Sequence, residues 1–192
     1  RGALQKAVQD AVFLKVYQYR ARDLANTAWS FARLKMTDSQ LLASITAHSL
    51  PKIQQCLPQE LSNLAWAIAT LQILDKTLMD VIAAEAIQKV LGFSVQNLAN
   101  TAWAFATLGV MDRPLVEAIS AETLKRISQF EPQALTNTVW SLATLGVSNV
   151  PLLEAIATQA RHKAEMYCPQ DIGNTSWAFA KLSYLDEQLF EA

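Results

Sequence analysis

Residues 98–109 read LANTAWAFATLG, and this pattern occurs five times along the chain. The chain contains five tryptophans, Trp29, Trp66, Trp103, Trp140 and Trp177, and each stands 37 residues after the one before. An Asn precedes every Trp by three residues, and a Leu follows it by five. A fixed period of about 20 to 50 residues is typical of solenoids, whose stacked repeats bury one continuous core. The pattern therefore predicts an array of repeats.

Each repeat contains signals for two helices. Pro58, Pro132 and Pro169 stand at the opening position of the first helix, where a missing N–H is tolerated, and Gly109 and Gly146 follow its end. The second helix begins after a good N-cap residue, at Asp38, Asp75, Asp112, Asn149 and Asp186. No alternating strand pattern competes. We therefore expect an all-α fold, an α-solenoid of antiparallel helical hairpins with a period of 37 residues.

Steps of 37 residues divide the whole chain, 1–192, into one array. A partial first repeat occupies 1–20, complete repeats lie near 21–57, 58–94, 95–131 and 132–168, and a truncated last repeat covers 169–192. The chain thus opens at a second helix and closes early in another. We expect it to be a segment of a longer protein, with any targeting sequence outside it.

Composition argues against several classes of protein. No stretch approaches about 18 uninterrupted apolar residues, so no membrane span is expected. The net charge of −1 provides no overall positive field to recruit nucleic acid, although a local basic strip remains compatible with it. Cys56 and Cys168 lack metal-ligand spacing and are expected to be reduced thiols packed between helices. Phosphate loops and nucleophile motifs do not occur, so we expect no enzymatic activity, cofactor, metal or small-molecule substrate.

A helical wheel separates a buried face of the first helix from a polar strip with Asn at its centre and Trp at its margin. The strip also contains the residues seven before and four after each Trp. The resulting candidates for ligand contact are Arg22, Asn26, Arg33, Gln59, Asn63, Thr70, Gln96, Asn100, Thr107, Gln133, Asn137, Thr144, Gln170, Asn174 and Lys181.

Two interpretations of the repeated Asn remain open. Asn is a poor residue for the middle of a helix, so some interaction must compensate for it in every repeat. The amides could bond to the neighbouring repeat and hold the hairpins in register, or they could face a ligand. For the Trp residues, core packing with a satisfied N–H is favoured over stacking with bases.

Basic residues occupy one position near the end of each second helix: Lys15, Lys52, Lys89, Arg126 and Lys163. Their expected role is to complement the helix dipole and to favour solubility. Pro51 stands in the body of one second helix and should kink it, because proline removes a backbone hydrogen bond.

The motif at 98–109, followed by the helix start at Asp112, resembles the octotricopeptide and heptatricopeptide repeat families. It is also similar to helical repeats in the RNA-editing substrate-binding complexes of kinetoplastids. The resemblance covers nearly the whole chain and all five Trp-centred units. It implies RNA binding in a mitochondrion or plastid, in stabilisation, processing, editing or translation of transcripts, with the RNA contacts on the first helix.

The leading hypothesis is therefore a non-enzymatic solenoid that binds single-stranded RNA in organellar RNA metabolism. Amides and hydroxyls would contact bases, and Arg or Lys would contact phosphates. One alternative is a protein–protein scaffold in which the Asn residues grip an extended peptide, as armadillo repeats do. Another is a structural subunit of a ribonucleoprotein that contacts RNA through shape alone.

Overall fold

The computed structural model of the chain describes residues 2–184, with side chains from residue 6 onward. Within that range it confirms the predicted all-α solenoid: α-helices alternate with short turns, and no strand occurs. The α-helices are α1 (Gly2–Lys15), α2 (Ala21–Arg33), α3 (Ser39–Ser49), α4 (Pro58–Thr70), α5 (Lys76–Lys89), α6 (Val95–Thr107), α7 (Arg113–Lys125), α8 (Pro132–Leu145), α9 (Val150–His162) and α10 (Pro169–Lys181). Short 3-10 turns follow the odd-numbered helices: η1 (Val16–Gln18), η2 (Leu50–Gln55), η3 (Val90–Gly92), η4 (Ile127–Gln129) and η5 (Ala164–Met166).

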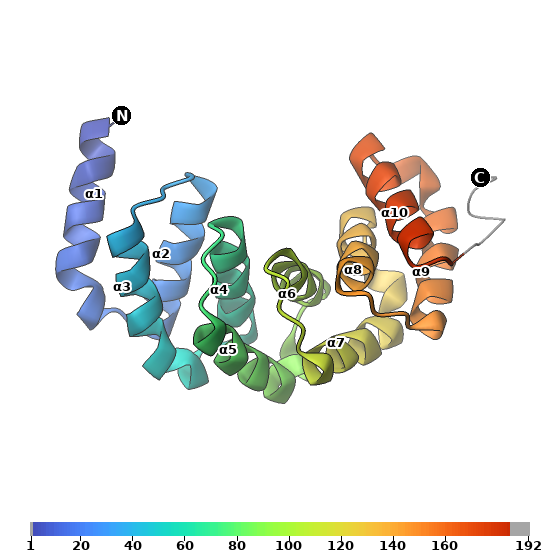
Figure 1. Ribbon diagram of the computed structural model, residues 1–192, viewed down its shortest axis with the longest axis horizontal. Helices are drawn as coiled ribbons and strands as arrows, with labels where there is room; N and C mark the ends of the chain where they lie inside the picture. The colour runs from blue at the N-terminus through green and yellow to red at the C-terminus, as the bar shows by residue number, and fades with distance from the viewer. Residues whose placement is uncertain (1, 185–192) are drawn as a thin grey trace.

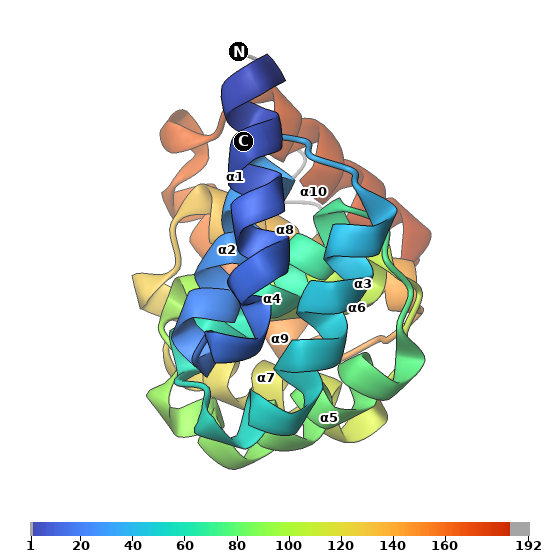
Figure 2. The same cartoon turned by 90° about the vertical axis from the view of Figure 1, so that its left-hand side faces the viewer.

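The helices form an arch of two layers (Figure 1). The even-numbered helices, α2 to α10, line the concave side, and the odd-numbered ones lie outside them. Neighbouring inner helices contact one another more closely than neighbouring outer helices do, which bends the array toward the inner side. Figure 2 looks along the array from its N-terminal end, with α1 nearest the viewer. The first residues of the inner helices are 37 residues apart, at Ala21, Pro58, Val95, Pro132 and Pro169.

The core is continuous along the array because each repeat contributes the same apolar positions. Leu61, Leu98 and Leu135 on the inner helices are fully buried, and Ile82 and Ile156 on the outer helices are buried as completely. Burying a Leu or Ile side chain contributes about 1.5–3 kcal/mol relative to leaving it exposed. The apolar face that the helical wheel predicted is therefore confirmed as the interior.

The predicted helix boundaries are confirmed where the structure describes them. The side chains of Asp38, Asp75, Asp112 and Asn149 accept hydrogen bonds at 2.8–3.2 Å from the backbone N–H three residues later. Asp186 lies outside the described residues. After each inner helix one residue adopts positive φ: Lys35, Gln72, Gly109, Gly146 and Ser183. Glycine adopts this conformation without strain, which explains Gly109 and Gly146 as helix stops.

Pro51 does not kink a continuous helix. Instead α3 ends at Ser49, and Pro51 stands in the first turn of the 3-10 segment η2, Leu50–Gln55. Proline is tolerated in the first turn of a helical segment because the N–H that it lacks has no helical partner there.

Four of the repeated basic residues make a contact that their expected role did not include. They cross to the preceding repeat and donate to the carbonyl oxygen 33 residues earlier. Lys52 Nζ donates to Tyr19 O, Lys89 Nζ to Cys56 O at 2.9 Å, Arg126 Nη1 to Phe93 O at 2.7 Å and Lys163 Nζ to Phe130 O at 2.7 Å. We call these contacts the carbonyl bridges.

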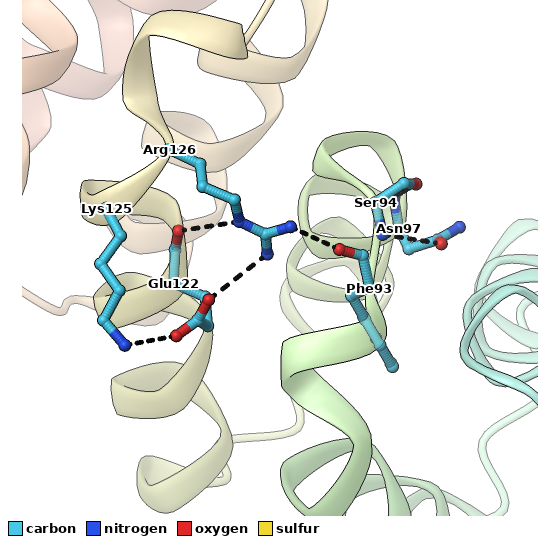
Figure 3. A network of polar contacts seen from close by, with 6 residues as sticks. All are labelled: Phe93, Ser94, Asn97, Glu122, Lys125 and Arg126. Carbon is cyan, nitrogen blue, oxygen red and sulfur yellow. Dashed lines mark hydrogen bonds and ion pairs between the residues drawn. The ribbon is translucent and has the colours of Figure 1, made fainter.

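Figure 3 shows the bridge made by Arg126. The accepting residue, Phe93, directly follows η3, where its carbonyl has no helical donor. Glu122 on α7 is largely buried, and its Oε2 lies 3.6 Å from Arg126 Nη2, so the guanidinium contacts Glu122 on one side and Phe93 O on the other. The carbonyl bridges therefore connect successive repeats at one fixed register.

Candidate nucleic-acid interface

One stripe of side chains runs along the exposed face of each inner helix. It consists of the residues at seven and three positions before the Trp, the Trp itself and the residue four after it. On α2 these are Arg22, Asn26, Trp29 and Arg33, and all four are exposed. None of the fifteen candidate residues is buried as a whole: the Gln and the cations are exposed, and most Asn and Thr are half-buried. We call the five adjacent stripes the inner track.

The five Asn side chains lie at the middle of the inner track. Asn26 is exposed, and Asn63, Asn100, Asn137 and Asn174 are half-buried. Within residues 6–184, no hydrogen bond from these amides to another repeat is observed. Contacts between inner helices involve other groups: Ser62 Oγ donates to Asn97 O at 3.2 Å, and the hydroxyls of Thr136 and Thr175 lie 3.0 Å apart. The geometry thus favours a role toward a ligand over a role in holding repeats together.

The expectation that the Trp residues belong to the core is wrong for Trp29 and Trp177 and correct in part for Trp66 and Trp103, which pack against the core. Trp29 and Trp177 are 41% and 45% exposed, and the three between them are half-buried. Their rings form a tilted row on the inner track, with centroids 6.4 Å apart for the Trp29–Trp66, Trp66–Trp103 and Trp140–Trp177 pairs. The residue after each of Trp66 and Trp103, Ala67 or Ala104, is fully buried, whereas the rings themselves are only partly covered.

Cations lie over the rings at both ends of the row. The Arg33 guanidinium carbon is 5.8 Å from the Trp29 ring centroid, and Lys181 Nζ is 4.8 Å from that of Trp177. Both pairs have i, i+4 spacing on one helix, and both distances suit an attraction between a cation and the ring face.

The three Thr candidates occupy the position of these cations on the middle helices, but their hydroxyls are not presented to solvent. The Oγ1 atoms of Thr70, Thr107 and Thr144 are covered, and no hydrogen-bond partner is found for them. The prediction that these hydroxyls face a ligand is therefore wrong for this conformation. Sequence pattern placed the Thr residues on the correct face, but the direction of a short side chain depends on how closely the next helix packs.

The acidic residues at the starts of the inner helices are engaged locally. Asp23 Oδ2 accepts from the Arg20 backbone N–H at 3.2 Å, and this bond lowers the pKa of the Asp23 carboxyl below its ordinary value. Glu60 is buried, and its Oε2 accepts from the Leu57 backbone N–H at 2.8 Å. These carboxylates therefore stabilise the starts of α2 and α4.

The two cysteines were expected to pack between helices, and this is correct for Cys56 only. Cys56 is buried between repeats, but Cys168 is exposed at the N-cap of α10, where its Sγ lies 3.1 Å from Asp171 Oδ2. Both are free thiols. In the described part of the chain, no group of three or more His, Cys, Asp and Glu side chains could hold a metal ion.

In the described part of the chain, open cavities lie away from the inner track. The larger, of about 540 Å³, is lined by residues of α3 and of the connection between α4 and α5, including Leu42, Leu74 and Asp75. The other, of about 310 Å³, lies between α1 and α3. Asp75, at the edge of the larger cavity, accepts a hydrogen bond from the Leu78 backbone N–H at the start of α5. Among the described helices, none is long and apolar enough to cross a membrane.

Sequence reasoning missed the carbonyl bridges and the surface position of the Trp row. A signal for the bridges was present, because a basic residue stands 33 residues after an aromatic or Cys residue in four successive repeats. The exposure of the Trp rings had no comparable signal, since a large apolar side chain beside Ala and Leu is usually buried.

Comparison with known families gives a match that covers almost all of the chain. The family model of RNA-editing substrate-binding complex 6 protein matches residues 3–145 and, in a second match, residues 72–188. The two matches overlap over 72–145, as expected when similar repeats align to more than one part of a repetitive family. No curated protein matches the sequence.

Proposed function

The chain belongs to the family of RNA-editing substrate-binding complex 6 proteins, and from this premise we propose that it is a non-enzymatic scaffold that binds single-stranded RNA in mitochondrial RNA editing. The inner track is the proposed contact surface. The observation that carries the proposal is the set of partly exposed Asn amides and Trp rings that repeats on every inner helix along the concave side, together with Arg22, Arg33 and Lys181.

The chemistry of the track suits an unpaired strand. Single strands expose base edges, which amides can recognise by hydrogen bonds, and base faces, which stack on aromatic rings and guanidinium planes. The three cations supply the attraction to phosphates. A duplex would present its sugar–phosphate surface instead and would leave the Trp rings without stacking partners.

A salt titration of a fluorescent single-stranded RNA tests this proposal. Each phosphate contact on a single strand contributes roughly −0.7 to the slope of log affinity against log salt, so three contacts predict a slope of about −2. Arg22→Gln, Arg33→Gln and Lys181→Gln should each weaken binding and reduce the slope. Arg113→Gln and Lys76→Gln are the matched controls, because both residues are exposed on outer helices and each change removes one positive charge. Absence of RNA binding at low salt would overturn the proposal.

An extended peptide is the second candidate ligand, and one observation favours it. The helices α4, α6 and α8 contain no basic residue, whereas neutral Asn amides could pair with both the N–H and C=O groups of a peptide backbone. Asn100→Ala separates this role from a structural one. We expect the variant to keep its melting temperature, because the amide has no partner in another repeat, and to lose affinity for the ligand. A large drop in melting temperature would contradict a ligand-facing role.

A further inference from the structure

Charge in the inner layer is concentrated in its two end helices. Between them, α4, α6 and α8 contain a single charged residue, Glu60, and that carboxylate is buried against the start of α4. The end helix α2 contains Arg22, Asp23 and Arg33, and the end helix α10 contains Asp171 and Lys181; of these, only the three cations belong to the inner track. The inner track is therefore positive at both ends and uncharged over the three helices between them.

The two ends share one local arrangement. At each end, a cation four residues after the Trp lies over the ring, at 5.8 Å for Arg33 and 4.8 Å for Lys181. The rings of Trp29 and Trp177 are also the most exposed of the five, at 41% and 45%. On the middle helices the rings are half-buried and the cation is replaced by a Thr with a covered hydroxyl.

We propose that the inner track holds single-stranded RNA at two anchors, the Trp29–Arg33 pair and the Trp177–Lys181 pair, and that the strand crosses the uncharged middle between them. This inference rests on the proposed function and specifies how the same surface binds. α2 and α10 stand at opposite arms of the arch (Figure 1), so one strand must cross the concave side to contact both anchors.

Each anchor combines the two interactions that a nucleotide offers. The cation attracts a phosphate, and the exposed ring provides a stacking surface for a base, with an added contribution where Arg takes part. An acidic peptide could satisfy the two cations, but carboxylates have no planar ring system to stack on Trp29 and Trp177. Along the middle, the Asn amides would contact bases without fixing a phosphate.

Two linked anchors predict a threshold in strand length. A strand that contacts both anchors gains from the high effective concentration of its second end, whereas a shorter strand binds each anchor independently. If the strand advances roughly one base per repeat, the threshold falls near five or six nucleotides.

The test is isothermal titration of the protein with oligouridines of about two to about twelve nucleotides. Short strands should bind weakly with two per chain, and strands above the threshold should bind with one per chain and about a hundred-fold more tightly. Arg33→Gln or Lys181→Gln should halve the number of short strands bound and abolish the gain of long strands. Arg113→Gln should change neither quantity, and circular dichroism melting curves should show that all variants fold.

The outcomes distinguish this inference from the proposed function. If RNA binds but affinity rises smoothly with length, or if the two variants leave the length dependence unchanged, the two anchors are wrong while RNA binding stands. If no strand of any length binds, both the anchors and the proposed function are overturned. If poly-glutamate displaces long oligouridine at equal concentration of charge, the assignment of RNA to the anchors is overturned, because stacking would then contribute nothing.

Discussion

At the scale of single residues, surroundings rather than residue type decide chemistry, and the two thiols show this most simply. Cys56 is 3% exposed, and its Sγ lies 3.9 Å from Lys52 O. Burial raises the pKa of the Cys56 thiol to about 11, from an ordinary value of 9.0. Cys168 is exposed at a helix start. Only a thiolate reacts readily, so the two residues should differ strongly in reactivity.

We therefore predict that an aromatic disulfide reagent at pH 8 labels Cys168 quickly and Cys56 only after unfolding. Cys168→Ser should remove the fast phase, and Cys56→Ser should leave it unchanged. The same pKa shift predicts a contribution to stability that is full below pH 9 and is lost as the pH rises through 11, because only the unfolded thiol ionises in that interval. Fast labelling of both thiols in the folded protein would contradict the buried position of Cys56.

At the scale of helices and turns, the carbonyl bridges show how one hairpin is aligned on the next. Lys89 Nζ donates to Gln54 O at 2.7 Å and to Cys56 O at 2.9 Å, and it also lies 3.1 Å from Glu85 Oε2. The Glu85 side chain is 10% exposed, so the ion pair is largely shielded from water. Removing one partner of such a pair leaves the other charge buried without compensation.

Lys89→Met should therefore lower the free energy of unfolding by about 2–4 kcal/mol, measured by urea denaturation. Lys89→Arg should retain most of the stability, since Arg126 makes the equivalent bridge. Adding Glu85→Gln to Lys89→Met should recover part of the loss, which identifies the buried carboxylate as one cause. Lys76→Met on the same helix is an exposed control and should change stability little. An unchanged unfolding free energy for Lys89→Met would show that the bridge does not stabilise the array.

At the scale of the whole molecule, stability should vary along the arch, because each repeat contacts mainly its neighbours. α4, α6 and α8 each have inner neighbours on both sides, and their core residues are buried almost completely. Among the described helices, α10 contacts one inner helix, α8, and its Ile172 is 53% exposed where the equivalent Leu135 is fully buried.

Hydrogen exchange followed by mass spectrometry should thus find the slowest backbone exchange in α4, α6 and α8 and faster exchange in α1 and α10. The reason is that the end helices can open without breaking contacts on two sides. Uniform protection from one end to the other would instead indicate that the array unfolds as a single cooperative unit.

The sequence by itself determined the fold class, the helix boundaries and the exposed stripe. A single cap residue or Leu is an ambiguous signal, but the same residue type at the same position of every repeat is a reliable one. Asp38, Asp75 and Asp112 recur in this way, and each caps the start of an outer helix. Only the tertiary structure decided which residues of different repeats lie close together and in which direction each side chain points. It brought Lys89 to a carbonyl oxygen 33 residues away, left the rings of Trp29 and Trp177 exposed and covered the hydroxyl of Thr107. These outcomes depend on how closely one hairpin packs on the next, which the period of a sequence does not specify.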